Sequence, residues 1–133
     1  MKPENAKYLE DNFAFMKRGP SAESCYNMFG FECGDGWFDI IKNLCEEIAK
    51  LEIDGLSVDQ VKEKFGNLRF YVSFHSENTN PDTDKKIEKL YRLIDEAEKK
   101  SNEICENCGA DGSPRTDKCW IQTLCDACAG QRK

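Results

Sequence analysis

The stretch 56–74, LSVDQVKEKFGNLRFYVSF, decides the fold, because its apolar residues repeat with a period of two rather than the helical period. The alternation breaks once and resumes on the opposite parity at Val61, so we expect a strand with a bulge near residues 59–60. Gly66-Asn67 is a two-residue loop typical of hairpins, and LRFYVSF after it is rich in branched and aromatic residues. The stretch therefore predicts an antiparallel β-hairpin.

Strand pairing sorts the side chains of this hairpin onto two faces. If Phe65 pairs with Leu68, one face is apolar and the other is polar. The apolar face would hold Val61, Phe65, Leu68, Phe70, Val72 and Phe74. The polar face would hold Lys62, Lys64, Arg69 and Tyr71. Glu63 falls on the apolar face, which is irregular for a charged side chain.

Two segments with the helical period flank the hairpin. Residues 37–51 place their apolar side chains on one face behind Asp35, a plausible N-cap. Residues 84–104 also place their apolar side chains on one face and would form a helix about 30 Å long. An isolated hairpin is only marginally stable, so both helices are expected to pack on its apolar face. The fold class expected is α+β, with two main helices on a small antiparallel sheet.

The N-terminal segment holds less periodic signal. Residues 4–16 have an amphipathic pattern behind Pro3, which favours a short peripheral helix within residues 1–20. Residues 21–36, SAESCYNMFGFECGDG, show no clear period and predict an ordered loop whose aromatic side chains pack on the core. The GDG at the end of this loop indicates only a turn with a cap.

Four cysteines follow the second helix with the spacing C-x2-C-x16-C-x2-C, namely Cys105, Cys108, Cys125 and Cys128. Two residues between thiols let a tight turn point both sulfurs at one ion, and four thiolates complete a closed tetrahedron around zinc. Closed sites of this kind are usually structural, since catalytic zinc keeps a position open for water. We expect residues 105–133 to form a zinc ribbon or knuckle beside a core domain of residues 1–104, because so short a tail cannot fold by burial alone.

The other four cysteines lack this spacing. Cys119 could replace one ligand, but it lies away from any CxxC turn, which favours a spare thiol. A second metal site would need a fourth ligand beside Cys25, Cys33 and Cys45, and His75 is the sole histidine of the sequence. Buried small side chains are the simpler interpretation of these three cysteines.

Charge and composition limit the possible partners. The formal net charge is -6 and no segment is strongly basic, which disfavours a nucleic-acid surface. The start, MKPENAKYLED, lacks the apolar stretch of a signal peptide, and no run approaches the roughly 20 apolar residues of a membrane span. We expect a cytoplasmic protein without a membrane partner, whose cysteines are metal ligands and free thiols rather than disulfides.

No spacing in the sequence indicates a particular reaction. Nucleophile elbows, phosphate-binding glycine loops and the motifs of zinc proteases and deaminases are absent. Glu63 and His75 remain pocket candidates, because Glu63 could meet Arg69 or His75 beside the hairpin. The simpler interpretation of Glu63 is a charge that blocks the pairing of an edge strand. We therefore expect a protein that is not an enzyme.

Four sequence blocks, in order, carry a resemblance to known proteins. They are FECGDGWFDIIKNLCEE, QVKEKFGNLRFYV, LYRLIDEAEKKS, and CENCGADG with WIQTLCDAC. Over residues 31–128 the chain resembles a set of small bacteriophage and prophage proteins with no assigned activity. The resemblance implies a phage-associated protein in the cytoplasm of a bacterial host. Small phage proteins of this kind often bind or inhibit host machinery, including antiviral defence.

The leading hypothesis is a non-enzymatic protein that binds a host protein. Its surface would combine the hairpin's outer face with the aromatic loop, in which Tyr26 and Trp37 would be anchors. The alternative hypothesis is a protein that sequesters a nucleotide or nucleotide-derived signal. The phenol ring of a tyrosine would stack on the base, and cationic side chains would bind the phosphate. The residues of that site would be Lys62, Lys64, Arg69 and Tyr71. A small enzyme and a nucleic-acid-binding zinc ribbon are the weaker alternatives.

Overall fold

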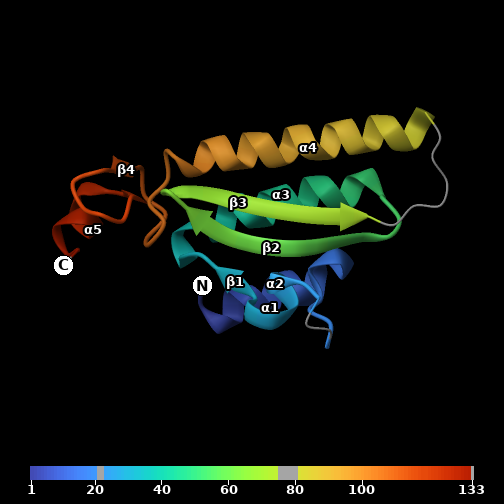
Figure 1. Cartoon of the computed structure of the whole chain (residues 1–133), viewed down its shortest axis with the longest axis horizontal. Helices are drawn as coiled ribbons and strands as arrows, with labels where there is room; N and C mark the ends of the chain where they lie inside the picture. The colour runs from blue at the N-terminus through green and yellow to red at the C-terminus, as the bar shows by residue number, and fades with distance from the viewer. Residues whose placement is uncertain (21–22, 75–80, 133) are drawn as a thin grey trace.

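The computed structural model describes residues 1–20, 23–74 and 81–132, and it confirms a mixed α+β fold (Figure 1). The helices are α1 (Pro3–Asn12), α2 (Cys25–Phe29), α3 (Phe38–Leu51), α4 (Pro81–Ser101) and α5 (Asp126–Gly130). The strands are β1 (Phe31–Glu32), β2 (Leu56–Lys64), β3 (Asn67–Phe74), β4 (Ser113–Arg115) and β5 (Gln122–Leu124). Short 3-10 turns occupy Ala14–Met16 and Asp35–Trp37. Among the described residues, none of the helices combines the length with the apolar composition of a membrane span.

The main sheet has the order β1-β2-β3, so the hairpin strand β2 is central. β2 pairs with β3 antiparallel, and the register shifts between Val58 and Gln60, which confirms the expected bulge. β1 pairs with β2 in parallel. This strand was not expected, because residues 21–36, in which it lies, were interpreted as a loop. α2 lies in that same segment. Elements as short as α2 and β1 are too brief to show a period in the sequence.

The hairpin turn is displaced by one residue from the predicted one. Lys64 pairs with Asn67, so the two central residues are Phe65 and Gly66, and the predicted Phe65–Leu68 pair is wrong. Both have positive φ, 55° and 80°, as the primed turns that match strand twist require. Phe65 therefore leaves the apolar face and is 70% exposed at this hairpin tip.

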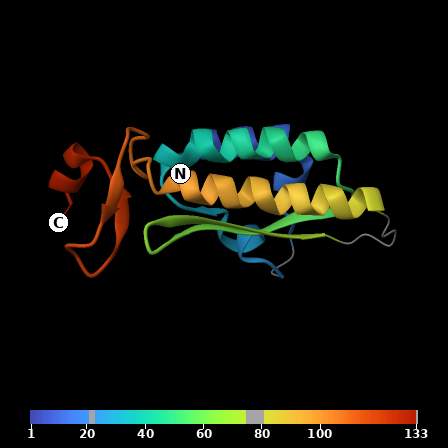
Figure 2. The same cartoon turned by 90° about the horizontal axis from the view of Figure 1, so that it is seen from above.

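The remaining assignment of faces is confirmed. Val61 lies opposite Phe70 on the inner face, and Lys62 lies opposite Arg69 on the outer face. α3 lies behind the sheet in Figure 1, and Figure 2 shows α3 and α4 running side by side. A single core of buried side chains draws members from α1, α2, α3, β2, β3 and α4.

α4 lies along the open edge of β3 and accepts hydrogen bonds from two of its backbone N–H groups. The Leu68 N–H donates to Ser101 Oγ at 2.9 Å, and the Phe70 N–H donates to Glu98 Oε2 at 3.1 Å. An unpaired strand edge is a template for aggregation, and a covering helix removes it. α4 thus shields the sheet's edge as well as contributing to the core.

The N-terminal helix is confirmed over Pro3–Asn12, with Pro3 at its first position, but the chain is extended at Phe13 and the rest of the expected helix is a 3-10 turn. The expected capping role of Asp35 is wrong, because α3 begins after Trp37 without a side-chain cap. The Asp35 carboxylate instead accepts hydrogen bonds from the Lys2 N–H at 3.2 Å and from Asn5 Nδ2 at 2.6 Å. It therefore fixes the start of α1 beside the loop that precedes α3.

Candidate metal centre

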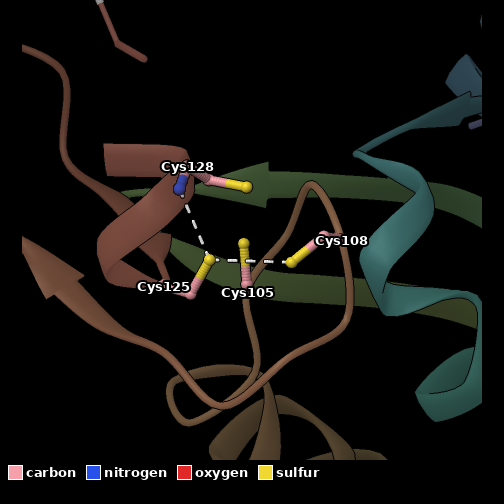
Figure 3. A group of neighbouring side chains, drawn as sticks. All are labelled: Cys105, Cys108, Cys125 and Cys128. Carbon is pink, nitrogen blue, oxygen red and sulfur yellow. Dashed lines mark hydrogen bonds between the residues drawn. The ribbon is translucent and has the colours of Figure 1, made fainter. Parts of the chain in front are cut away.

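The four cysteines of the predicted metal site come together at the end of α4 (Figure 3). Their sulfur atoms all lie within 4.8 Å of one another, close enough to share one metal ion such as zinc. Cys105 and Cys108 stand on a turn closed by the Gly109 N–H bonding to Cys105 O at 3.0 Å, where Gly109 has φ 84°. The second pair begins at Cys125, the N-cap of α5. The Cys128 N–H donates to Cys125 Sγ at 3.4 Å.

The surroundings of these thiols shift their pKa values in opposite directions. Burial opposes ionisation of Cys105, but hydrogen bonds from the backbone of Cys125, Cys108 and Asn107 lower the pKa of its thiol to about 6. The Cys128 thiol behaves differently, because the neighbouring thiols of Cys125 and Cys105 raise its pKa to about 12. Thiolates this close repel one another unless a cation lies between them. A bound divalent cation would hold all four in the thiolate form.

The first cysteine turn docks on the GDG loop before α3. The Gly36 N–H donates to Glu106 O at 2.7 Å, and the Gly34 N–H donates to the buried Glu106 carboxylate at 2.8 Å. A Cβ added at Gly36 would lie 2.6 Å from Gly109 N and closer still to Cys105 O. The interpretation of this loop as only a capped turn is therefore wrong. Its glycines permit the close approach of two backbones separated by about seventy residues of chain.

The hairpin tip supplies a second dock for residues 105–132, which we call the module. Thr123 Oγ1 donates to Gly66 O at 2.6 Å, and Trp120 Nε1 donates to Glu63 Oε1 at 3.1 Å. The other Glu63 oxygen accepts from the Gly66 N–H at 3.3 Å. The inward charge of Glu63 thus connects the central strand to the module. Its interpretation as an edge-strand charge is wrong, because β2 is not an edge.

Arg69 does not join Glu63 in a pocket, since the two side chains lie on opposite faces of the hairpin. His75, the other pocket candidate, lies outside the described residues. Within the described parts of the chain, we find no convergent group of acid, base and nucleophile that would define a reaction.

The remaining cysteines differ in exposure. Cys119 is exposed and lies outside the four-cysteine cluster, as a spare thiol would. Cys33 and Cys45 are buried in the core, as expected, and burial raises the pKa of Cys33 to about 12. Cys25 is exposed at the start of α2, so its interpretation as a buried side chain is wrong.

The two proposed aromatic anchors are core residues. Tyr26 is 1% exposed and its hydroxyl donates to Met16 O at 2.5 Å, while Trp37 is 0% exposed and its indole donates to Ile104 O at 2.9 Å. Neither ring can contact a partner in the folded protein, so their prediction as binding residues is wrong. The sequence did not distinguish them from the exposed aromatic residues, because the surrounding segment has no period to assign faces.

The predicted nucleotide residues do share one surface. Gln60 pairs with Tyr71 next to the pair of Lys62 and Arg69, and Tyr71 is 43% exposed. Glu32 of β1 lies in register with Lys62 and places a carboxylate on the same face. The outer face of the hairpin is therefore mixed in charge rather than purely cationic.

Sequence reasoning missed the residues that dock the module. Glu106, Thr123 and Trp120 carry the contacts, but none belongs to a recognisable spacing. The only available signal was the inward position of Glu63, a charge that needed a partner. Its partner lies 57 positions along the chain, beyond the reach of local patterns.

The fold and the cluster together define a small α+β protein with a four-cysteine centre at the end of its longest described helix. Comparison with protein-family models, with curated proteins and with solved structures gives no match for the chain. The resemblance to phage proteins accordingly stays a prediction.

Proposed function

We propose that the protein is a small zinc-stabilised binding protein that engages a protein of a bacterial host. Four thiolates form a soft, closed ligand set that suits zinc and leaves no open position for water or substrate. The metal would therefore act on folding rather than on chemistry. The resemblance to phage proteins is what suggests a host partner, including a component of antiviral defence.

The observation that carries the proposal is a pair of exposed aromatic side chains where the hairpin meets the module. Phe65 at the hairpin tip is 70% exposed, and Trp120 before β5 is 55% exposed. The Glu63 carboxylate bonds to both segments, through Gly66 N and Trp120 Nε1. Exposed aromatic residues of this size commonly dominate the energy of protein interfaces.

Cations accompany both rings. Lys64 Nζ lies 5.8 Å from the centre of the Phe65 ring, and the Arg132 guanidinium lies 5.9 Å from that of Trp120. Aromatic residues with Arg at their border are typical of binding surfaces, and they favour a partner surface with carboxylates. We call Phe65, Trp120, Lys64 and Arg132 the tip patch.

The test is quantitative capture of a host protein on immobilised protein. One host protein should be enriched by the wild type and lost with the double variant Phe65→Ser/Trp120→Ser. Tyr91→Ser is the matched control, because Tyr91 is a 50% exposed aromatic residue elsewhere, on α4. Equal capture by all three proteins would contradict the proposal.

A nucleotide ligand on the outer face remains a second candidate, favoured by the placement of Lys62, Arg69 and Tyr71 on one face of the hairpin. A nucleotide bound there would raise the melting temperature by mass action. The rise should disappear in Arg69→Gln and persist in Phe65→Ser. A panel of nucleotides that leaves the wild-type melting temperature unchanged would remove this candidate.

A further inference from the structure

A groove of about 360 Å³ runs between α3 and α4, which lie side by side in Figure 2. Its floor is apolar and is formed by Ile40, Leu44, Leu93, Ala97 and Ile104. The volume lies in the range of ligand and peptide sites in proteins, roughly 300–1,000 Å³.

The two walls of the groove carry polar side chains in helical rows. On α3 the row is Asp39, Asn43 and Glu47, spaced four residues apart, so it spans about 12 Å along the axis. On α4 the row is Glu96 and Lys100. Each row stands above the apolar floor, so the site combines apolar contact with a polar border.

The border is acidic. Three carboxylates face one ammonium group, and Glu47 alone among the three forms an ion pair, with Lys50 at 2.9 Å. Within the described residues, Asp39 and Glu96 have no ion-pair partner. With three carboxylates against one ammonium group, the border attracts a cationic partner and disfavours an anionic one.

One end of the groove is built from the junction with the module. Gly36 and Gly109 line that end, and the two residues are in backbone contact. Because Gly109 directly follows Cys108, the shape of this end depends on the docked cysteine turn.

We propose that this groove binds a basic amphipathic helix of a partner protein. Apolar side chains spaced three or four residues apart would enter the groove between the two helices, while flanking Lys or Arg side chains meet Asp39 and Glu96. A second copy of this chain is a poor occupant, because its net charge of -6 opposes the acidic border. The groove lies between the helices and shares no residue with the tip patch, so the proposal does not depend on the proposed function.

The test uses synthetic peptides of about three helical turns. The first has Leu at helical spacing and Lys at the flanking positions, the second has Glu in place of each Lys, and the third is a scrambled isomer of the first. Affinity is measured by isothermal titration, and the site is mapped by NMR through the amides of Ile40, Leu93 and Ala97. We expect the Lys peptide to bind, with the Glu and scrambled peptides at least about tenfold weaker.

Variants separate the groove from general charge attraction. Asp39→Asn/Glu96→Gln removes one carboxylate from each wall. Asp84→Asn/Glu88→Gln is the matched control, because it also removes one first-turn Asp and one Glu from a described helix. Asn43→Trp places a large ring over the groove from an exposed position. Both groove variants should weaken the Lys peptide by about tenfold or more, and the control should change it by less than about twofold.

Three outcomes would overturn the proposal. The Lys peptide could bind the groove variants as tightly as the control, which would assign it to general acidity of the surface. The Glu peptide could bind equally well, which would remove the charge argument. A concentration-dependent dimer that Asn43→Trp abolishes would assign the groove to a second copy. Phe65→Ser, which removes a tip-patch side chain without touching the docks of the module, should leave peptide binding unchanged, and this keeps failure here distinct from failure of the tip patch.

Discussion

The core and the module differ in how much apolar surface each buries. The core cluster holds 19 buried hydrophobic residues, all between Leu9 and Ala97. Among its described residues, the module buries only Cys105 and Leu124 of this kind, alongside the polar Glu106, Gln122 and Thr123. A segment with so little apolar burial cannot offset the conformational entropy of its own folding. We therefore propose that the module is ordered by a metal ion in the four-cysteine cluster and by its docks on the core.

The largest expected effect comes from removing one thiol of the cluster. Cys125→Ser should reduce bound zinc from about one ion per chain to far less, because structural zinc contributes on the order of 10 kcal/mol that three thiolates cannot match. Hydrogen exchange should then show fast exchange across the module and retained protection in α3, β2 and β3. Elemental analysis and exchange mass spectrometry measure the two effects.

Cys119→Ser is the matched control, since this exposed thiol lies outside the cluster. It should bind zinc like the wild type. If Cys125→Ser retained one zinc and a protected module, the structural role of the metal would be wrong.

The second prediction concerns the stability of the core alone. Leu90 is 0% exposed on α4, so Leu90→Ala leaves a cavity and should lower the free energy of unfolding by about 2–5 kcal/mol. Zinc stoichiometry should not change at room temperature, because the cluster does not contact this position. Lys89→Ala, an exposed neighbour, should change stability by less than about 0.5 kcal/mol. Urea denaturation measures both, and a zinc loss in Leu90→Ala would show that core and module are not separable.

The third prediction concerns the contact between the core and the module at Gly36. Gly36→Ala would force a methyl group against backbone atoms of the first cysteine turn, and such overpacking costs about 1–3 kcal/mol. We expect the module to unfold before the core, so calorimetry should resolve two transitions in place of one. Gly130→Ala is the matched control, because nothing lies within 4 Å of its added Cβ. A single unshifted transition for Gly36→Ala would contradict the dock.

The contrast between regions also explains what could be predicted from sequence. The hairpin, its bulge and the two long helices follow from periods within about twenty residues, and the four cysteines follow from spacing. The docks depend on contacts between distant segments, such as Gly36 with Glu106, which no local pattern contains. The turn was misplaced because Gly66 can occupy either central position of a two-residue loop. Tyr26 and Trp37 were misassigned because aromatic residues serve cores and interfaces equally well.

The smallest expected effect concerns the edge of β3, where the Phe70 N–H donates to the Glu98 carboxylate of α4. Burial raises the pKa of Glu98, while the Phe70 N–H and the charge of Arg69 lower it in part. A raised pKa means that the folded state holds the proton more tightly than the unfolded state. This contribution to stability is therefore present below the ordinary carboxyl pKa and is lost as the pH rises through the raised value.

Glu98→Gln keeps an oxygen that can accept the Phe70 N–H and removes the ionisation. The free energy of unfolding of Glu98→Gln minus that of the wild type should be larger at about pH 7 than at about pH 4. The increase should be less than about 1 kcal/mol, because solvent screens this partly buried side chain. Urea denaturation at both pH values gives this difference, in which the shared pH dependence of the zinc site cancels. Glu98→Ala removes the acceptor and should be less stable than Glu98→Gln at both pH values. A difference between Gln and wild type that decreases as the pH rises would show that the ionised carboxylate stabilises this edge, contrary to the direction of its pKa.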